Sequence, residues 1–313
     1  MKTQYARVSI GFLLVALLLG CDKYPPIEDD MLDGNVIFDP SINNPEQFLI
    51  SAKYANPTLQ DLDKHIIIAA HGYTSSTFEW SEFQEWSQNE NYRVSQVLLG
   101  GHGLTYDAFR ASSWEDWLET IKLEYEALEK LGYKKISFVG SSTGSTLLLE
   151  LVQSGYFNSH ITPKNIFLID PIVVPSVKLQ SIAGIIGPML VYIETDQTKE
   201  EDKYWYHFRP QETVKELNEL IKKVQKGLED GFKLPEGTYL KTFHSKNDPV
   251  ANSLSTVLIY KGLRDFNGNK IDVHIMDSDI HVFTRLKLRP YVSQLELDNQ
   301  QAAFAQIAQK LNE

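Results

Sequence analysis

The segment 136–149 limits the possible folds of this chain more than any other part of the sequence. It opens with Ile-Ser-Phe-Val, an apolar run of the kind that fills a buried strand. The run leads without a spacer into Gly140-Ser141-Ser142-Thr143-Gly144, and the apolar pattern over 143–153 is that of a helix. A strand joined so directly to a helix is the first half of a βαβ unit. The segment therefore predicts an α/β protein with a mostly parallel central sheet.

The chain from about residue 46 to residue 313 repeats this alternation of strand and helix patterns. The run 65–70 (His-Ile-Ile-Ile-Ala-Ala) is continuously apolar, as a central strand covered on both faces must be. Ser112-Ser113-Trp114-Glu115 has the spacing of a capping box, which predicts a helix that ends at Gly132. We expect helices on both faces of the sheet, with further helices at 143–153, 252–261 and 294–311 and strands at 47–52, 65–70, 93–99, 135–139, 165–169, 239–243 and 270–276.

One stretch, at about 171–236, is too long for a simple crossover between two parallel strands. It holds an apolar segment at 182–193, an aromatic cluster at 204–208 and a helical pattern at 211–227. A crossover needs only a dozen or more residues. We interpret the stretch as a helical cap inserted over the carboxyl-terminal edge of the sheet. The alternative is a structural subdomain with no part in binding.

The amino terminus has the organisation of a secretory signal. Lys2 and Arg7 precede an apolar run at 10–19, and Leu18-Leu19-Gly20-Cys21 resembles the lipobox of bacterial lipoproteins. In that family the peptide is cut before the cysteine, which is then lipidated. The resemblance implies a signal peptide at 1–20, a lipidated Cys21 with a tether over 21–45, and a lipid-anchored protein of the bacterial cell envelope. An uncleaved anchor and a free core cysteine are the alternatives.

Charge and cysteine content exclude several classes of protein. The formal net charge is −11, whereas nucleic-acid binding relies on a basic surface, so no nucleic-acid partner is expected. Cys21 is the single cysteine of the sequence. A disulfide within the chain and a cysteine-based zinc site are therefore impossible.

The pattern Gly-x-Ser-x-Gly around Ser142 is typical of an exposed nucleophile. Between a strand and a helix the turn is sharp, so the residues two before and two after the serine must be small. The helix amino terminus then stabilises negative charge near the serine hydroxyl. The register favours Ser142 over Ser141 and Ser145. A phosphate-binding glycine-rich turn is the alternative interpretation.

Acyl transfer also needs two backbone amides that face the developing oxyanion. Thr143, the residue after the nucleophile, is expected to supply one. The run 65–70 is followed by His71-Gly72-Tyr73, which resembles the His-Gly-aromatic loop of microbial carboxylesterases and monoacylglycerol lipases. In those enzymes the residue after His-Gly gives the second amide, which points here to Tyr73. His71 is expected to brace the loop.

With these motifs the sequence resembles the α/β-hydrolase superfamily from about residue 64 to its end. Gly101-His102-Gly103, followed by Trp114-Glu115-Asp116-Trp117, matches a further loop and helix start of the esterase and monoacylglycerol-lipase-like set. The resemblance implies the α/β-hydrolase fold. We expect His102 to be structural.

The superfamily order of serine, acid and histidine points to Asp248 and His281. Asp248 follows the strand pattern 239–243, and Asp170, after the preceding strand, is the competing acid. His281 follows the strand pattern 270–276, with His244 as the runner-up. The loop before His281 is acidic, which favours the imidazolium and a raised pKa of the histidine. A cation site formed by His281 with Asp277 and Asp279 is the remaining alternative.

The expected activity is hydrolysis of a carboxylic ester through an acyl-enzyme, without a metal or an organic cofactor. Apolar and aromatic residues in the expected cap, together with a membrane anchor, favour a short- or medium-chain ester or a monoacylglycerol-like lipid as substrate. The same residues support thioesterases and peptidases. A different class of function is a non-catalytic envelope lipoprotein that binds an acyl ligand or a protein partner.

Overall fold

The computed structural model describes residues 37–88, 90–176, 192–194 and 197–313. The expected signal peptide, Cys21 and most of the expected tether lie outside the described residues, as does most of the apolar segment 182–193. No helix within the described ranges combines the length and apolar character needed to cross a bilayer.

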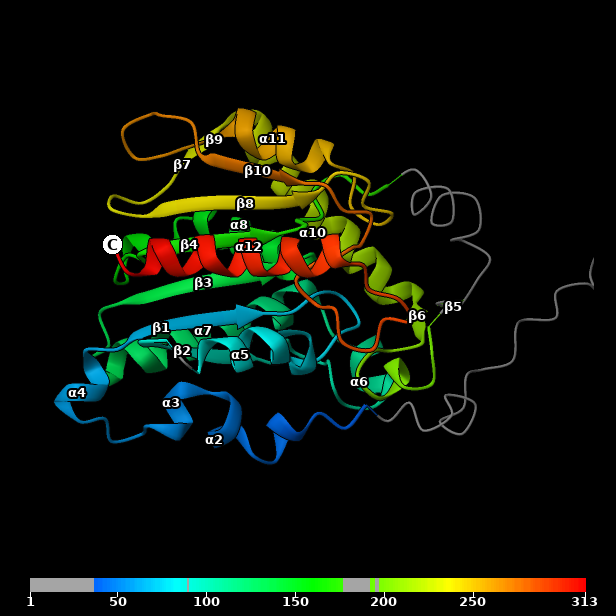
Figure 1. Cartoon of the computed structure of the whole chain (residues 1–313), viewed down its shortest axis with the longest axis horizontal. Helices are drawn as coiled ribbons and strands as arrows, with labels where there is room; N and C mark the ends of the chain where they lie inside the picture. Colours follow the sequence, from blue (N-terminus) through cyan, green and yellow to red (C-terminus); the bar gives the residue numbers. More distant parts are fainter. Residues whose placement is uncertain (1–36, 89, 177–191, 195–196) are drawn as a thin grey trace, which may run out of the picture.

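Six strands of the described chain form one parallel sheet, as predicted (Figure 1). Their order is β10-β8-β4-β3-β1-β2, and every neighbouring pair is parallel. After β1 the chain forms β2 along one edge of β1, and it then crosses back to form β3 along the other edge. The direction in which strands are added to the sheet therefore reverses between β1 and β3. Ligands of open α/β sheets bind at the carboxyl end of such a switch point. The strands are β1 (His65–Ala70), β2 (Tyr92–Val97), β3 (Ile136–Ser141), β4 (Asn165–Ile169), β8 (Tyr239–Ser245) and β10 (Asp272–Met276).

Helices cover both faces of this sheet. Side chains of β1 alternate between two buried clusters, with Ile66 and Ile68 in one and Ile67 and Ala69 in the other. The first cluster is completed by α7 (Trp114–Leu131), α8 (Thr143–Gln153), α10 (Gln211–Asp230) and α11 (Leu254–Gly262), and the second by α5 (Ser81–Ser87) and α12 (Gln294–Leu311), which lies in front of the sheet in Figure 1. The continuous apolar run predicted for β1 follows from this double coverage.

The prediction of a strand at 47–52 was wrong. The chain forms two short helices there, α2 (Pro45–Phe48) and α3 (Ile50–Lys53). Pro45 occupies the first helical turn, where its missing N–H is no loss. The amide of Ile50 donates to the side-chain Oγ of Ser95, a residue of β2, at 2.9 Å rather than to a backbone carbonyl of that strand.

The capping box of α7 is one residue later than predicted. Ser113 is the N-cap: its hydroxyl accepts from the Asp116 amide at 3.2 Å, and the Asp116 carboxylate accepts from the Ser113 amide at 2.8 Å. Aspartate here takes the place of the glutamate expected at 115. Gly132 ends the helix in the left-handed conformation, with φ 98°.

The stretch between β4 and β8 is partly described. It contains β5 (Tyr192–Glu194), β6 (Phe208–Pro210) and α10, which runs past the predicted end at 227. Leu217, Leu220 and Val224 of α10 belong to the same buried cluster as α8. The extent of the expected cap remains a prediction, since 177–191 is outside the described ranges.

The aromatic segment before β6 lies against the loop that follows β1. The Tyr206 amide donates to the Thr74 carbonyl at 2.9 Å, and Tyr204 stacks on Phe78 at 3.8 Å between ring centroids. The remaining elements are η1 (Pro40–Ile42), α4 (Leu59–Leu62), η2 (Thr77–Trp80), α6 (Tyr106–Arg110), η3 (Tyr156–Asn158), η4 (Glu201–Lys203), β7 (Phe232–Lys233) and β9 (Leu263–Arg264).

Candidate active site

Ser142 lies in the sharp turn between β3 and α8, at the switch point of the sheet. Its backbone has φ 47° and ψ −114°, which is strained for a residue with a side chain. The two glycines make the turn possible. A Cβ on Gly140 would lie 2.8 Å from the Gly144 carbonyl carbon, and one on Gly144 would lie 2.2 Å from the Ala70 carbonyl oxygen. This is the close approach that the Gly-x-Ser-x-Gly pattern predicted.

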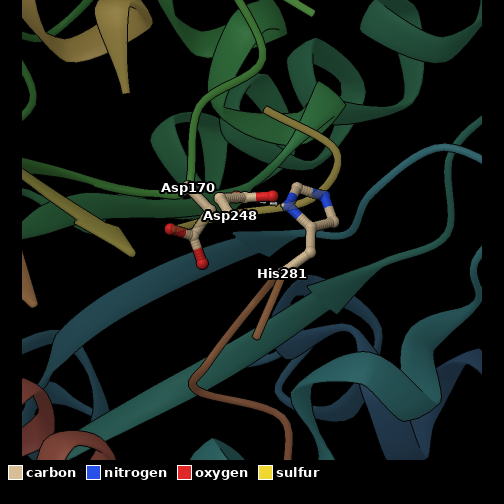
Figure 2. Close-up of side chains that lie close together, drawn as sticks. All are labelled: Asp170, Asp248 and His281. Atoms are coloured by element: carbon tan, nitrogen blue, oxygen red, sulfur yellow. Dashed lines mark hydrogen bonds and ion pairs between the residues drawn. The ribbon is translucent and has the colours of Figure 1, made fainter. Parts of the chain in front are cut away.

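His281 and Asp248 come together with Ser142 from loops far apart in the sequence. The Asp248 carboxylate accepts a hydrogen bond from His281 Nδ1 at 2.7 Å (Figure 2). Because Nδ1 carries the proton, Nε2 is free to accept from the Ser142 hydroxyl, 2.9 Å away. The second Asp248 oxygen accepts from the amides of Val250 and Ala251 at 2.7 and 2.9 Å. The arrangement gives the serine hydroxyl a base in one fixed tautomer.

The charges of this pair shift both pKa values. Burial opposes the charged form of His281, but the neighbouring Asp248 carboxylate outweighs it and raises the pKa of His281. Burial likewise opposes ionisation of Asp248, yet His281 and the amide hydrogen bonds lower its pKa. The predicted direction for His281 agrees, but its source differs. Asp277 and Asp279 are exposed, and the carboxyl groups that raise the pKa of His281 are Asp248, then Asp170 and Glu79.

Asp170, the competing acid of the sequence, lies beside this pair without bonding to the histidine. It follows β4, is fully buried and has φ 45°. Among the described residues, Asp170, Asp248 and His281 form a group whose oxygen and nitrogen atoms lie within 4.8 Å of one another, the spacing of a cation site (Figure 2). Their hydrogen bonds to one another and to backbone amides already engage these atoms. The alternative cation site with Asp277 and Asp279 is not formed by the described residues.

The loop after β1 lies directly against Ser142. A Cβ added to Gly72 would be 3.2 Å from Ser142 Cβ. Within the described chain, the amides of Tyr73 and Thr143 donate to no protein acceptor, as expected of amides kept for an oxyanion. The Tyr73 ring packs against Phe109 and Trp117, and this packing helps to hold the Tyr73 backbone in place.

Sequence reasoning missed Glu79. This buried carboxylate accepts from the Gly72 amide at 2.8 Å and from the Ser141 hydroxyl. It thereby joins the loop after β1 to Ser141, the residue before Ser142. A lone acid between Phe78 and Trp80 was the available sign of a buried carboxylate.

The other candidate histidines have structural contacts. His71 Nδ1 donates to the Gly72 carbonyl at 2.8 Å and Nε2 accepts from the Leu99 amide at 3.0 Å, so it braces the loop as predicted. Burial lowers the pKa of His71 and of His102. His244, the runner-up base, is fully buried and donates to the Ala251 carbonyl.

Backbone strain gathers at this edge of the sheet. Five described residues other than glycine have positive φ: Leu288, with φ 67°, lies further along the chain, and Thr74, Ser142, Asp170 and Val282 have φ of 65°, 47°, 45° and 54°. These four follow β1, β3, β4 and β10, so each stands in a loop at the carboxyl ends of the strands. Strain of this kind is typical of functional sites.

Comparison with known proteins rests on structure. No family model matches the sequence, and no curated protein matches it. The fold is similar to a structure of the metagenome-derived lipolytic enzymes LipS and LipT, with a TM-score of 0.60 and 18% identity over 78% of this chain and 94% of that one. It is also similar to the monoglyceride lipase of Saccharomyces cerevisiae, with a TM-score of 0.60 and 12% identity over 79% of this chain and 86% of that one. A third similar structure is the monoacylglycerol lipase of Paleococcus ferrophilus, with a TM-score of 0.57 and 9% identity over 78% of this chain and 94% of that one. Together with the parallel sheet, these matches show that the chain has the α/β-hydrolase fold.

Proposed function

We propose that the protein is a serine hydrolase that cleaves carboxylic esters through an acyl-enzyme. The observation that carries the proposal is the pair of hydrogen bonds made by His281, to Ser142 Oγ at 2.9 Å and to Asp248 at 2.7 Å. A serine hydroxyl needs a base within this reach, and the base needs an acid to hold its tautomer. The strained turn presents the hydroxyl at the edge of the sheet.

The reaction follows from these contacts. His281 Nε2 takes the Ser142 proton as the oxygen attacks the ester carbonyl, and the amides of Tyr73 and Thr143 stabilise the oxyanion. The imidazolium, stabilised by Asp248, then protonates the leaving alcohol. Water repeats the cycle on the acyl-enzyme and releases the acid. These steps use groups of the chain alone, so no metal or organic cofactor is part of the proposal.

The proposed substrate is a short- or medium-chain ester or a monoacylglycerol-like lipid. The similar solved structures include lipolytic enzymes and monoacylglycerol lipases, and aromatic residues at 204–208 cover the loop beside Ser142. We further propose that Cys21 carries a lipid that holds the enzyme on a membrane of the bacterial cell envelope, near such substrates. Mass spectrometry of the purified amino-terminal peptide tests the anchor separately.

A fluorophosphonate probe tests the nucleophile. Labelling of the wild-type chain that disappears in Ser142→Ala supports the hydrolase. Ser154→Ala is the matched control, because Ser154 is exposed at the other end of α8 and should label as the wild type does. Absence of labelling in the folded wild-type chain would contradict the hydrolase and favour a non-catalytic lipoprotein that binds an acyl ligand or a protein.

A substrate panel tests the reaction class. Para-nitrophenyl esters from acetyl to palmitoyl, an acyl thioester and a peptide anilide are compared by kcat/KM. The proposal expects turnover to be greatest with an ester. A thioester or peptide preferred over every ester would assign the same residues to a thioesterase or a peptidase instead.

A further inference from the structure

Asp170 is a buried carboxyl group that the proposed reaction does not use. It has no exposed surface, and its backbone is held in the left-handed region at φ 45°. A carboxyl group in such a place is destabilising unless its oxygens are hydrogen-bonded or its charge is compensated. Its partners therefore indicate what it does.

The two oxygens of Asp170 connect the loops that carry the acid and the base. Oδ1 accepts from the Ser245 amide at 2.6 Å, three residues before Asp248. Oδ2 accepts from the Phe283 amide at 3.2 Å, two residues after His281. The neighbouring Ile169 carbonyl accepts from the Ser142 amide at 2.9 Å. The end of β4 thus touches all three loops of the candidate site.

The contacts of the Ser245 hydroxyl bear on whether Asp170 carries a proton. Its one hydrogen can serve a single acceptor fully, and the Ile280 carbonyl at 2.8 Å, an atom that can only accept, is the nearer of the two acceptors within reach. The same hydroxyl oxygen lies 3.3 Å from Asp170 Oδ2. If the serine hydrogen points to Ile280, a hydrogen bond at this longer contact needs a hydrogen on the carboxyl group. A protonated Oδ2 supplies it.

The net effect of the surroundings of Asp170 also favours its protonated, neutral form. Burial, and then the Asp248 carboxylate beside it, raise the pKa of Asp170, although His244 and His281 act in the opposite direction. The guanidinium of Arg289, which donates to the His281 carbonyl, is a positive charge near Asp170 and also favours the ionised form. Two carboxylates that share one dry site do not both ionise readily. Each of the two carboxyl groups accepts from two backbone amides, but Asp248 also bonds the imidazole, so we infer that Asp248 holds the negative charge.

We propose that Asp170 is a positioning residue that holds the acid loop and the histidine loop together as a neutral carboxylic acid, with its proton donated to Ser245 Oγ. The inference rests on the proposed function, because the position that it protects is that of a catalytic base. Among the described residues, Asp248 is then the only charged carboxyl group that bonds to His281. A second negative charge at Asp170 would raise the pKa of His281 further and leave less neutral base at neutral pH.

The decisive comparison is between Asp170→Asn and Asp170→Ala. Asparagine is a neutral mimic of the protonated acid: its oxygen accepts from Ser245, and its amide replaces the hydroxyl donor. Only the bond from Phe283 is lost, so kcat/KM is expected to fall by less than about tenfold. Alanine frees both loops, and a shift of about 1 Å in the base is expected to lower kcat/KM by about a hundredfold.

The pH profile separates the proton from mere structure. In Asp170→Asn the apparent pKa of the base in kcat/KM stays where it is in the wild type, because no charge has been removed. A downward shift of about one unit or more would show that Asp170 is ionised and overturn the proposal. Equal activity of Asp170→Ala and wild type would overturn the positioning role. Asp279→Asn, an exposed aspartate near His281 in the same loop, is the matched control.

A measurement on the wild-type chain covers the case in which the variants do not fold. Infrared spectra with carbon-13-labelled aspartate are expected to show a protonated carboxyl band that persists at about pH 8, well above the ordinary pKa of aspartate. Absence of any such band would overturn the proposal. This result does not depend on turnover, so it stands apart from the Ser142→Ala labelling test of the proposed function.

Discussion

His71 and His281 occupy similar places in the fold, and their surroundings give them opposite properties. Each follows a strand at the carboxyl edge of the sheet, and each uses both ring nitrogens in hydrogen bonds. His71 faces a carbonyl and an amide, so burial prevails and lowers its pKa. His281 faces the Asp248 carboxylate, which outweighs burial and raises its pKa. The two histidines therefore differ in the group that Nδ1 contacts: a backbone carbonyl for His71, which braces a loop, and a carboxylate for His281, the proposed base.

The largest effect is expected for His281→Ala. Without the base, kcat is expected to fall by about 10⁵-fold or more, as in enzymes that lose a member of a cooperating set. Steady-state kinetics with a short-chain para-nitrophenyl ester, checked by circular dichroism, measures it.

His71→Asn is the partner experiment for the same comparison. It disturbs the loop that carries the Tyr73 amide, so a drop nearer 10²-fold is expected, with no loss of the titrating base. Equal losses for the two histidines would break the distinction drawn between them.

Asp248→Asn tests what the carboxylate contributes. The asparagine oxygen is expected to keep the bonds from the Val250 and Ala251 amides, which leaves its NH2 group facing Nδ1. Nδ1 must then accept, so the wrong tautomer is favoured and kcat is expected to fall by about 10⁴-fold. A loss smaller than tenfold would indicate that Asp170 or another group takes over the role of the acid.

Glu79→Gln tests the loop after β1, which His71 also braces. Glutamine keeps an acceptor for the Gly72 amide but removes the charge and disturbs the bond from Ser141. We expect kcat to fall by about 10- to 100-fold with little change in KM, because the oxyanion donors lose alignment only in part. A change confined to KM would place Glu79 in substrate binding instead.

The pH dependence is the mildest test. The base must be neutral to take the serine proton, and Asp248 raises its pKa above the ordinary value for histidine. Activity is therefore present above that raised pKa and falls about tenfold per unit as the pH drops below it. His71 has a lowered pKa and stays neutral over this range. A profile that is flat down to about pH 5 would contradict the raised pKa.

Local sequence patterns predicted much of the sheet and several helices. The bounds of β1, β4 and α12 agree with those expected, because their apolar periodicity reflects burial on one or two faces. The segment 47–52 was predicted wrongly, since short helices bury too few side chains to leave a clear period. Ser142 was recognisable because strand, turn and helix are contiguous around it.

The supporting residues of the site were harder to predict. Asp170 meets Ser245 and Phe283, which are 75 and 113 residues away in the sequence. Its role as a link between loops depends on contacts that no local pattern contains. The sequence raised it only as a rival acid. The catalytic roles of Ser142, Asp248, His281, Tyr73 and Thr143 remain predictions that the experiments above test.

The left-handed backbone at Ser142 has a consequence for heat resistance. A side chain held at φ 47° stores roughly 1–3 kcal/mol of strain, which glycine would not experience. An inactive Ser142→Gly chain is therefore expected to melt at a higher temperature than the native protein. Stability alone would therefore favour glycine at position 142, and a serine there is consistent with the proposed role of its hydroxyl.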